Sequence, residues 1–140
     1  MKTALITGAT SGIGRATAHE LAKQNIQLIL CGRRQERLDE LEALLSMNTN
    51  VLTLNLDVRD KTAVKSILSE LPEKFNSVDI LINNAGNAHG LDPIETGVID
   101  DWDAMIDINV KGLLYVSEAI IPSMVAKESG HIINIGSSAG

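Results

Sequence analysis

The sequence is poor in the residues that would mark several classes of protein. It has one cysteine, Cys31, which excludes an internal disulfide and is typical of a reducing compartment. Its apolar runs are shorter than a membrane-spanning helix needs, and the run that follows Met1 is too short for a signal peptide. The net charge of −6 argues against nucleic acid as a partner. We therefore expect a cytoplasmic protein that binds neither nucleic acid nor a membrane.

Aromatic residues are also scarce, because the chain has one Trp, one Tyr and one Phe. Hydrophobic residues nevertheless make up 44% of the sequence, so the core must be built from Leu, Ile, Val and Ala. A length of 140 residues is enough for one domain with its own core. We expect residues 1–140 to form a single domain.

Short apolar runs alternate with segments of helical periodicity along the whole chain. The runs predict buried strands over residues 4–6, 27–31, 51–56, 78–82 and 131–135. Helices are expected over 13–24, after Arg34, from Asp60 as a capping residue to Pro72, and over 101–126. This order predicts an α/β fold, namely a doubly wound parallel sheet of the Rossmann type with three α/β/α layers.

The segment Thr7–Gly14 joins the first strand to the first helix. Its glycines, Gly8, Gly12 and Gly14, allow a tight turn and let backbone approach a ligand without an intervening Cβ. The unpaired N–H groups at the start of a helix bind phosphate. A purely structural glycine turn is the alternative interpretation, but the strand before the turn and the helix after it favour phosphate binding.

Polar clusters follow all five predicted strands. Because the carboxyl ends of parallel strands meet at one edge of the sheet, these clusters are expected to line a single binding crevice. The clusters are residues 8–14, 32–34, 57–58, 83–86 and 136–140.

The cluster after the second strand indicates which dinucleotide would bind. A site for NAD carries an acid about 20 residues beyond the glycine turn, whereas a site for NADP carries an arginine there. This chain has Arg33 and Arg34 at that place, and the guanidinium fork suits a phosphate. The alternative is that both arginines are ordinary solvent-exposed residues at the start of a helix, although a positive charge is unfavourable at that end of the helix dipole. We favour NADP over NAD, with Asp57 placed either to accept from an adenine amino group or to serve as an ordinary turn acid.

Asn109 falls within an apolar stripe of the last predicted helix, which we expect to be a buried face. A buried amide there is either a satisfied core residue or part of a proton relay, and the pattern alone does not choose. Ser137 and Ser138 follow the last strand and belong either to a flexible loop or to a site that holds a carbonyl oxygen. His19, His89 and His131 lack the spacing of metal ligands, so no metal is expected. The stripe consists of Trp102, Met105, Ile106, Val110 and Leu113.

Four motifs in order resemble those of the short-chain dehydrogenase/reductase family, in its classical type. They are Thr7–Gly14, the Asn-Asn-Ala-Gly of residues 83–86, the Asn-Val-Lys-Gly of residues 109–112, and the serine-containing strand end at 134–140. Within the family, residues 32–38 and 130–136 are similar to those of bacterial NADP-dependent 3-hydroxy acid dehydrogenases. The resemblance implies an oxidoreductase that transfers hydride between NADP and a 3-hydroxy acid or a similar small alcohol or carbonyl compound.

The resemblance also implies a role for each matching residue. Asn109 would support the proton relay, and Ser137 would bond the reacting oxygen, with Ser138 in its place if the register differs by one. Arg33 and Arg34 would bind the 2′-phosphate, while Asp57 and Val58 would contact adenine. A homotetramer is implied for a complete chain. The remaining cofactor contacts would be Gly8, Ser11, Gly12, Ile13 and Gly14 in the glycine turn, and Asn84, Ala85 and Gly86 on the adenosine side.

One departure from the family is large. The Tyr-x-x-x-Lys pair that serves as general acid and base lies beyond the serine strand in the family. Here the one tyrosine, Tyr115, has Ala119 four residues later and lies on a different element. We therefore expect these 140 residues to be the N-terminal part of the enzyme, without its last strands and without turnover of their own. A non-catalytic NADP-binding module is the alternative, and a nucleotide-sugar epimerase is disfavoured by the glycine spacing.

Overall fold

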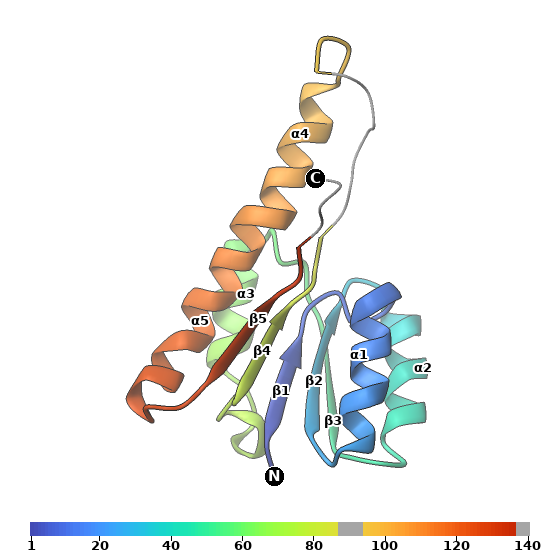
Figure 1. The fold of residues 1–140 in the computed structure, drawn as a ribbon, viewed down its shortest axis with the longest axis vertical. Coiled ribbons are helices and arrows are strands. Elements are labelled where there is room, and N and C mark those ends of the chain that lie inside the picture. Colours follow the sequence, from blue (N-terminus) through green and yellow to red (C-terminus); the bar gives the residue numbers. More distant parts are fainter. Residues whose placement is uncertain (87–93, 137–140) are drawn as a thin grey trace.

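A computed structural model describes residues 1–86 and 94–136. Its centre is a parallel sheet with the strand order β3-β2-β1-β4-β5 (Figure 1). This order reverses direction beside β1, so the predicted doubly wound sheet is confirmed. The strands are β1 (Thr3–Ile6), β2 (Gln27–Gly32), β3 (Val51–Asn55), β4 (Ile80–Asn83) and β5 (His131–Asn134).

Helices cover both faces of this sheet, as Figure 1 shows. On one face lie α1 (Gly12–Lys23) and α2 (Gln35–Leu45), and on the other lie α3 (Lys61–Ser69) and α5 (Leu113–Ala126). A short 3₁₀ turn, η1 (Glu73–Phe75), precedes β4, and α4 (Ile99–Ile106) precedes the segment that leads into α5. The described helices include none with the length and apolar character of a membrane span.

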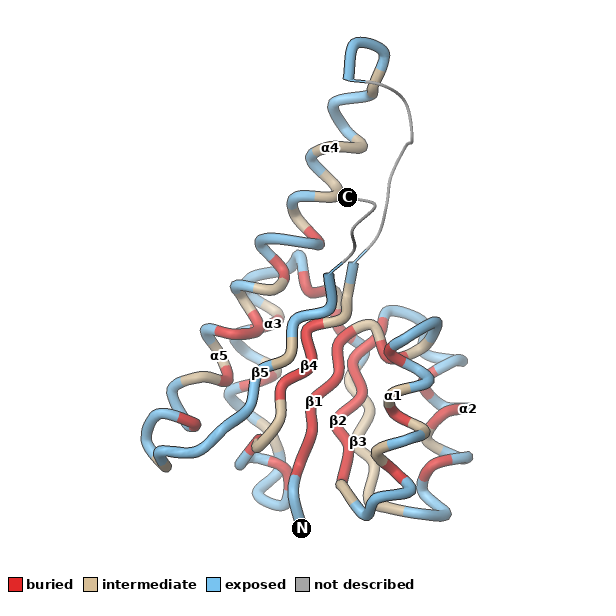
Figure 2. Tube along the Cα trace, in the orientation of Figure 1, coloured by how far each residue is buried: buried red, intermediate tan, exposed pale blue. Residues whose placement is uncertain are grey.

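The strands divide their side chains between two cores because successive residues point to opposite faces. Leu5 packs with α3 and α5, whereas its neighbours Ala4 and Ile6 pack with α1 and α2. All six residues of β2 are buried, and Figure 2 shows the central strands as the most buried part of the chain. The expected Leu, Ile, Val and Ala core is confirmed, with Phe75 as its one aromatic member among the described buried residues.

The start of α3 confirms the capping role of Asp60. Its Oδ1 accepts a hydrogen bond of 3.0 Å from the backbone N–H of Ala63, which would otherwise have no partner within the helix. The helix ends at Ser69, so it does not reach Leu71 as the periodicity predicts. The chain turns there toward Pro72 and η1, which the sequence pattern did not indicate.

The long predicted helix contains an irregularity at its centre. Between α4 and α5 the backbone forms a π-helical segment, η2 (Asp107–Gly112), which includes Asn109. A Cβ on Gly112 would lie 2.5 Å from Cγ2 of Val58, so glycine lets this segment approach the loop that follows β3. Segments of this kind are frequent at functional sites.

The expectation that the Asn109 stripe is a buried face is wrong. Asn109 is exposed, and Ile106 and Val110 are each about half exposed, at 49% and 51%. Ile106 is exposed because α4 extends beyond the carboxyl edge of the sheet, where none of its residues is buried (Figures 1 and 2), and in η2 the side chain that is buried is that of Ile108. The buried positions instead start in η2 and continue along α5, at Ile108, Gly112, Val116, Ser117, Ile120 and Met124.

Asp79 joins three separate segments at the opposite edge of the sheet. Its Oδ2 accepts from the backbone N–H of Thr3 at 2.9 Å, and its Oδ1 accepts from Nζ of Lys127 at 2.9 Å. Burial raises the pKa of this carboxyl. The Thr3 N–H and the Lys127 ammonium together lower it by more than burial raises it, so the net pKa lies below the usual value. The ionised carboxylate therefore stabilises the folded state.

Replacing Asp79 with Asn should lower the free energy of unfolding at pH 7 by about 1–2 kcal/mol. Since the folded pKa is lowered, the contribution is present above the unfolded value near 3.8 and is lost as the pH falls below it. Urea unfolding at about pH 7 and pH 3 should show the difference between the variant and the native protein shrinking. An equal difference at both pH values would contradict the ionic role. Asp103→Asn on α4 is the control, expected within about 0.5 kcal/mol of the native protein.

Candidate cofactor site

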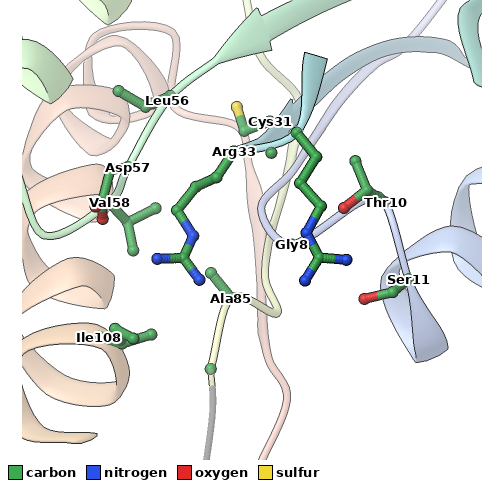
Figure 3. A pocket seen from close by; sticks show the side chains of 13 residues that line it. Gly8, Thr10, Ser11, Cys31, Arg33, Leu56, Asp57, Val58, Ala85 and Ile108 are labelled. Carbon is green, nitrogen blue, oxygen red and sulfur yellow. The ribbon is translucent and has the colours of Figure 1, made fainter. Parts of the chain in front are cut away.

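A cavity of about 300 Å³ opens at the carboxyl edge of the sheet, where the order of the strands reverses. Loops that follow four different strands contribute to it, as expected for a ligand crevice in a doubly wound sheet. Figure 3 shows these side chains converging on one space. The lining residues are Gly8, Thr10, Ser11, Cys31, Gly32, Arg33, Arg34, Leu56, Asp57, Val58, Ala85, Gly86 and Ile108.

The glycine turn is built for close approach of a ligand to backbone. Gly8 and Gly12 have φ values of +61° and +57°, which side-chain-bearing residues rarely adopt. A Cβ on Gly12 would meet nothing within 4 Å, so the start of α1 is open on that side. Ser11 is the N-cap of α1 but makes no side-chain capping bond, which leaves the first-turn N–H groups available to an anion.

Gly14 and Asn84 support the turn rather than line the cavity. A Cβ on Gly14 would collide with the carbonyl oxygen of Gly8 and with Nδ2 of Asn84. That Nδ2 donates to the Gly8 oxygen at 3.1 Å, so the Asn84 side chain joins the loop after β4 to the loop after β1. Ile13 also lies outside the cavity, with its side chain 60% exposed.

Thr7 also joins these two loops. Its side-chain oxygen accepts from the backbone N–H groups of Asn84 and Ala85, at 3.0 and 2.9 Å. Thr7 is only 2% exposed, so its side-chain oxygen is held in place by the surrounding core while it accepts from the two N–H groups. The sequence motif contained Thr7, but sequence reasoning assigned it no part in the site.

Arg33 and Arg34 follow β2 and line the cavity, and Figure 3 shows the side chain of Arg33 extending into it. Both side chains are exposed, and within the described ranges 1–86 and 94–136 neither has an acidic partner within 4 Å. Arg34 is the N-cap of α2, where its carbonyl oxygen accepts from the N–H of Leu38 at 3.1 Å, but its side chain makes no capping bond. The positive charge in the cavity is therefore uncompensated by ion pairing.

Asp57 lies opposite the arginines and is held by Arg59. Its Oδ1 accepts from Nε of Arg59 at 3.0 Å, and its Oδ2 accepts from Nη2 at 2.7 Å. The hydrogen bond from Arg59 is the main cause that lowers the pKa of Asp57, and the nearby Arg33 charge adds to it. Asp57 is thus a carboxylate at neutral pH. An ionised carboxylate has about four acceptor sites, so further acceptor capacity remains for a ligand donor.

Asn109 is not among the lining residues but lies beside one of them, Gly86. A Cβ on Gly86 would be 2.9 Å from Oδ1 of Asn109, so the side chain lies directly against Gly86, and η2 also places Ile108 in the cavity wall. Ser137 and Ser138 lie outside the described residues, and their roles stay predictions.

The structure thus brings most of the predicted residues together. Eight of them line the cavity, while Gly12, Ile13, Gly14 and Asn84 belong to its support or to the neighbouring surface. Thr10 and Gly32 were expected in the crevice as members of its clusters but were given no contact of their own, and Cys31, Leu56 and Ile108 were missed. Cys31 and Leu56 could have been found, because they lie at the ends of the same strands, whereas Ile108 depends on the π-helical segment. The eight are Gly8, Ser11, Arg33, Arg34, Asp57, Val58, Ala85 and Gly86.

Comparison with known proteins identifies the family. A family model described as short chain dehydrogenase matches residues 2–140. The chain belongs to the short-chain dehydrogenase family. The predicted resemblance is therefore confirmed on the motifs that carried it.

Curated relatives match over nearly the whole chain. An NADP-dependent 3-hydroxy acid dehydrogenase of Salmonella typhi is 45% identical over 136 residues, which is 97% of this chain and 54% of the relative. Sulfoacetaldehyde reductase 2 of Chromohalobacter salexigens is 50% identical over 137 residues, again 97% and 54% of the two chains. The chain therefore spans about half the length of the curated relatives it matches.

Solved structures of the family have the same fold. A closed form of serine dehydrogenase complexed with NADP⁺ has a TM-score of 0.91 and 45% identity, covering 99% of this chain and 55% of that one. An NAD⁺-bound xylitol dehydrogenase has a TM-score of 0.94 and 31% identity, covering 99% and 54%. Because enzymes with different nicotinamide cofactors share this fold, the fold alone does not select the cofactor.

The Thr7 hydroxyl should be essential to the geometry of the site. Thr7→Val removes the acceptor and leaves two partly buried N–H groups without their partner, at a cost of up to about 1–3 kcal/mol for each unsatisfied group. We expect a loss in that range by urea unfolding, together with weaker nucleotide binding. Thr7→Ser keeps the oxygen and should lose less on both measures. Equal losses for the Val and Ser variants would show that the hydroxyl does not hold the loops.

Proposed function

We propose that residues 1–140 form the dinucleotide-binding part of an NADP-dependent oxidoreductase. It would transfer hydride between the nicotinamide and a 3-hydroxy acid, or a similar small alcohol or carbonyl compound. The observation that carries this proposal is the pair of arginines without ion-pair partners at the cavity edge, Arg33 and Arg34, in a member of the short-chain dehydrogenase family.

The residues present fit an NADP molecule. The open first turn at Gly12 and the positive φ values that glycine permits in this turn suit the pyrophosphate. Arg33 and Arg34 would bind the 2′-phosphate, because a guanidinium presents several donors in a planar fork. Bound NADP⁺ would accept the hydride and bound NADPH would supply it, while the protein would hold and orient the cofactor.

The adenine end would lie between the loops after β3 and β4. Asp57 would accept from the adenine amino group while Arg59 fixes its orientation, and Val58 would pack against the ring. On the other side, Ala85 and Gly86 would contact the adenosine, with Asn84 holding their loop to Gly8.

Proton transfer would involve Asn109 and Ser137. The Asn109 carboxamide lies on a π-helical segment next to Gly86, where a polar group can support a water in a proton relay. Ser137 would bond the reacting oxygen of the substrate. A general acid or base would then come from outside this chain segment, as the family pattern implies.

The relatives guide the proposed substrate class. Their names specify a 3-hydroxy acid in one case and sulfoacetaldehyde in the other, and both compounds are small and carry an acidic group. We propose a 3-hydroxy acid as substrate, a cytoplasmic location and a family-type homotetramer for the complete protein.

The place of Tyr115 favours one rival. This single tyrosine borders a groove between α3 and α5, with Lys65 and Ala119, and is not among the residues that line the cofactor cavity. An NADP-binding module without catalysis would fit that arrangement.

Activity of the protein, expressed as its gene encodes it, separates the two. We expect NADP reduction, followed as nicotinamide absorbance, with serine or another 3-hydroxy acid, and slower reaction with the alcohol product of sulfoacetaldehyde. Tight NADPH binding without turnover of any of these compounds would support the binding module and overturn the proposal of an enzyme.

Replacing Arg33 and Arg34 with Gln should weaken NADPH by about tenfold or more, since charged hydrogen bonds contribute about 1.5–3 kcal/mol each. NADH lacks the 2′-phosphate, so its dissociation constant should change little. Titration of nicotinamide fluorescence measures both constants. Equal loss for the two nucleotides would show that the arginines do not recognise the phosphate. The double variant Lys23→Gln with Lys65→Gln, on α1 and α3 and absent from the cavity lining, controls for the loss of two positive charges.

A further inference from the structure

A second cavity adjoins the cofactor cavity on the side of α2. It has a volume of about 400 Å³ and lies between the first turns of α1 and α2. Thr10 and Ser11 line both cavities, so the two spaces meet at the glycine turn. The second cavity is lined by Thr10, Ser11, Gly12, Arg15, Arg37 and Glu40.

Arg15 and Arg37 are the cations of this second cavity. Both are exposed, and in the described part of the chain neither forms an ion pair within 4 Å, even though Glu40 is one helical turn from Arg37. Their guanidinium groups are therefore available to a ligand. No role was predicted for either residue from the sequence.

The distribution of basic residues singles out this region. The chain has five arginines and seven lysines. Four of the arginines line the two cavities, the fifth is Arg59 in its pair with Asp57, and no lysine lines either cavity. Arginine is the residue suited to forked binding of phosphate, so its concentration here in a chain of net charge −6 points to an anionic ligand.

We propose that Arg15 and Arg37 form the outer half of the site for the 2′-phosphate. The phosphate monoester would lie where the two cavities meet, beside Ser11, with Arg33 and Arg34 on its inner side. This inference rests on the proposed NADP function and deepens it. Selectivity for the phosphorylated nucleotide then depends on arginines from α1 and α2 as well as on those that follow β2.

Glu40 lines the same cavity as the two arginines but carries the opposite charge. Its carboxylate borders the same cavity and would repel a phosphate dianion. Removing this charge should strengthen binding of the phosphate, whereas removing either arginine should weaken it. A cavity that only joins two helices through surface charges would show no such opposite effects on a ligand.

The test uses competition by adenosine 2′,5′-bisphosphate and by 5′-AMP, which differ in the phosphate at issue. In the protein expressed as its gene encodes it, Arg15→Gln and Arg37→Gln should each weaken the bisphosphate by about fivefold to tenfold, given the exposure of these side chains. 5′-AMP should change less than about twofold. Glu40→Gln should bind the bisphosphate more tightly, again without effect on 5′-AMP. Lys23→Gln, at the other end of α1, is the control of equal charge change and should leave both ligands unaffected.

The outcomes separate this inference from the proposed function. A native protein that prefers the bisphosphate over 5′-AMP, with variants of Arg15 and Arg37 that keep this preference, would overturn the outer half-site and leave the NADP function standing. A native protein without any preference would overturn both. Equal weakening of both ligands in the two variants would indicate a structural role and would also contradict the proposal.

Discussion

The cofactor site depends on the hydrogen bonds that hold the loop after β4 against the loop after β1. Thr7 accepts from two consecutive N–H groups at Asn84 and Ala85, and the Asn84 amide donates back to the carbonyl of Gly8. Gly14 has no side chain, and a Cβ there would displace this contact. With the two loops fixed, the start of α1 and the end of β4 face one another across a defined space.

Electrostatics then decide what that space can hold. The protein as a whole is acidic, yet the cavities at the glycine turn concentrate its arginines, and Asp57 is the partner of Arg59 rather than of Arg33 or Arg34. An anion would therefore enter a region of local positive charge within a protein whose overall charge repels it. This arrangement favours an anion that makes specific contacts with the arginines over one attracted only by the net charge of the protein. A dinucleotide with an additional phosphate meets that requirement.

The fold was largely predictable because its signals are local and strong. The strand segments are continuous apolar runs, the helices between them have a 3.6-residue period, and Asp60 caps α3 as expected. The glycine turn and the strand-end clusters could be placed in one crevice from parallel topology alone. The boundaries of α3 and the 3₁₀ turn η1 were not predicted, because they depend on how the chain packs before β4.

The sequence by itself determined the sheet, the glycine turn and the arginines at the end of β2, since each follows from local pattern and from the geometry of parallel strands. Only the tertiary structure decided the environment of Asn109. An apolar stripe predicts burial only where another element covers it, and in η2 the buried positions are Ile108 and Gly112, so this asparagine is exposed and lies against Gly86. The meeting of Arg15 and Arg37 is likewise tertiary, because it requires α1 and α2 to lie side by side on the same face of the sheet.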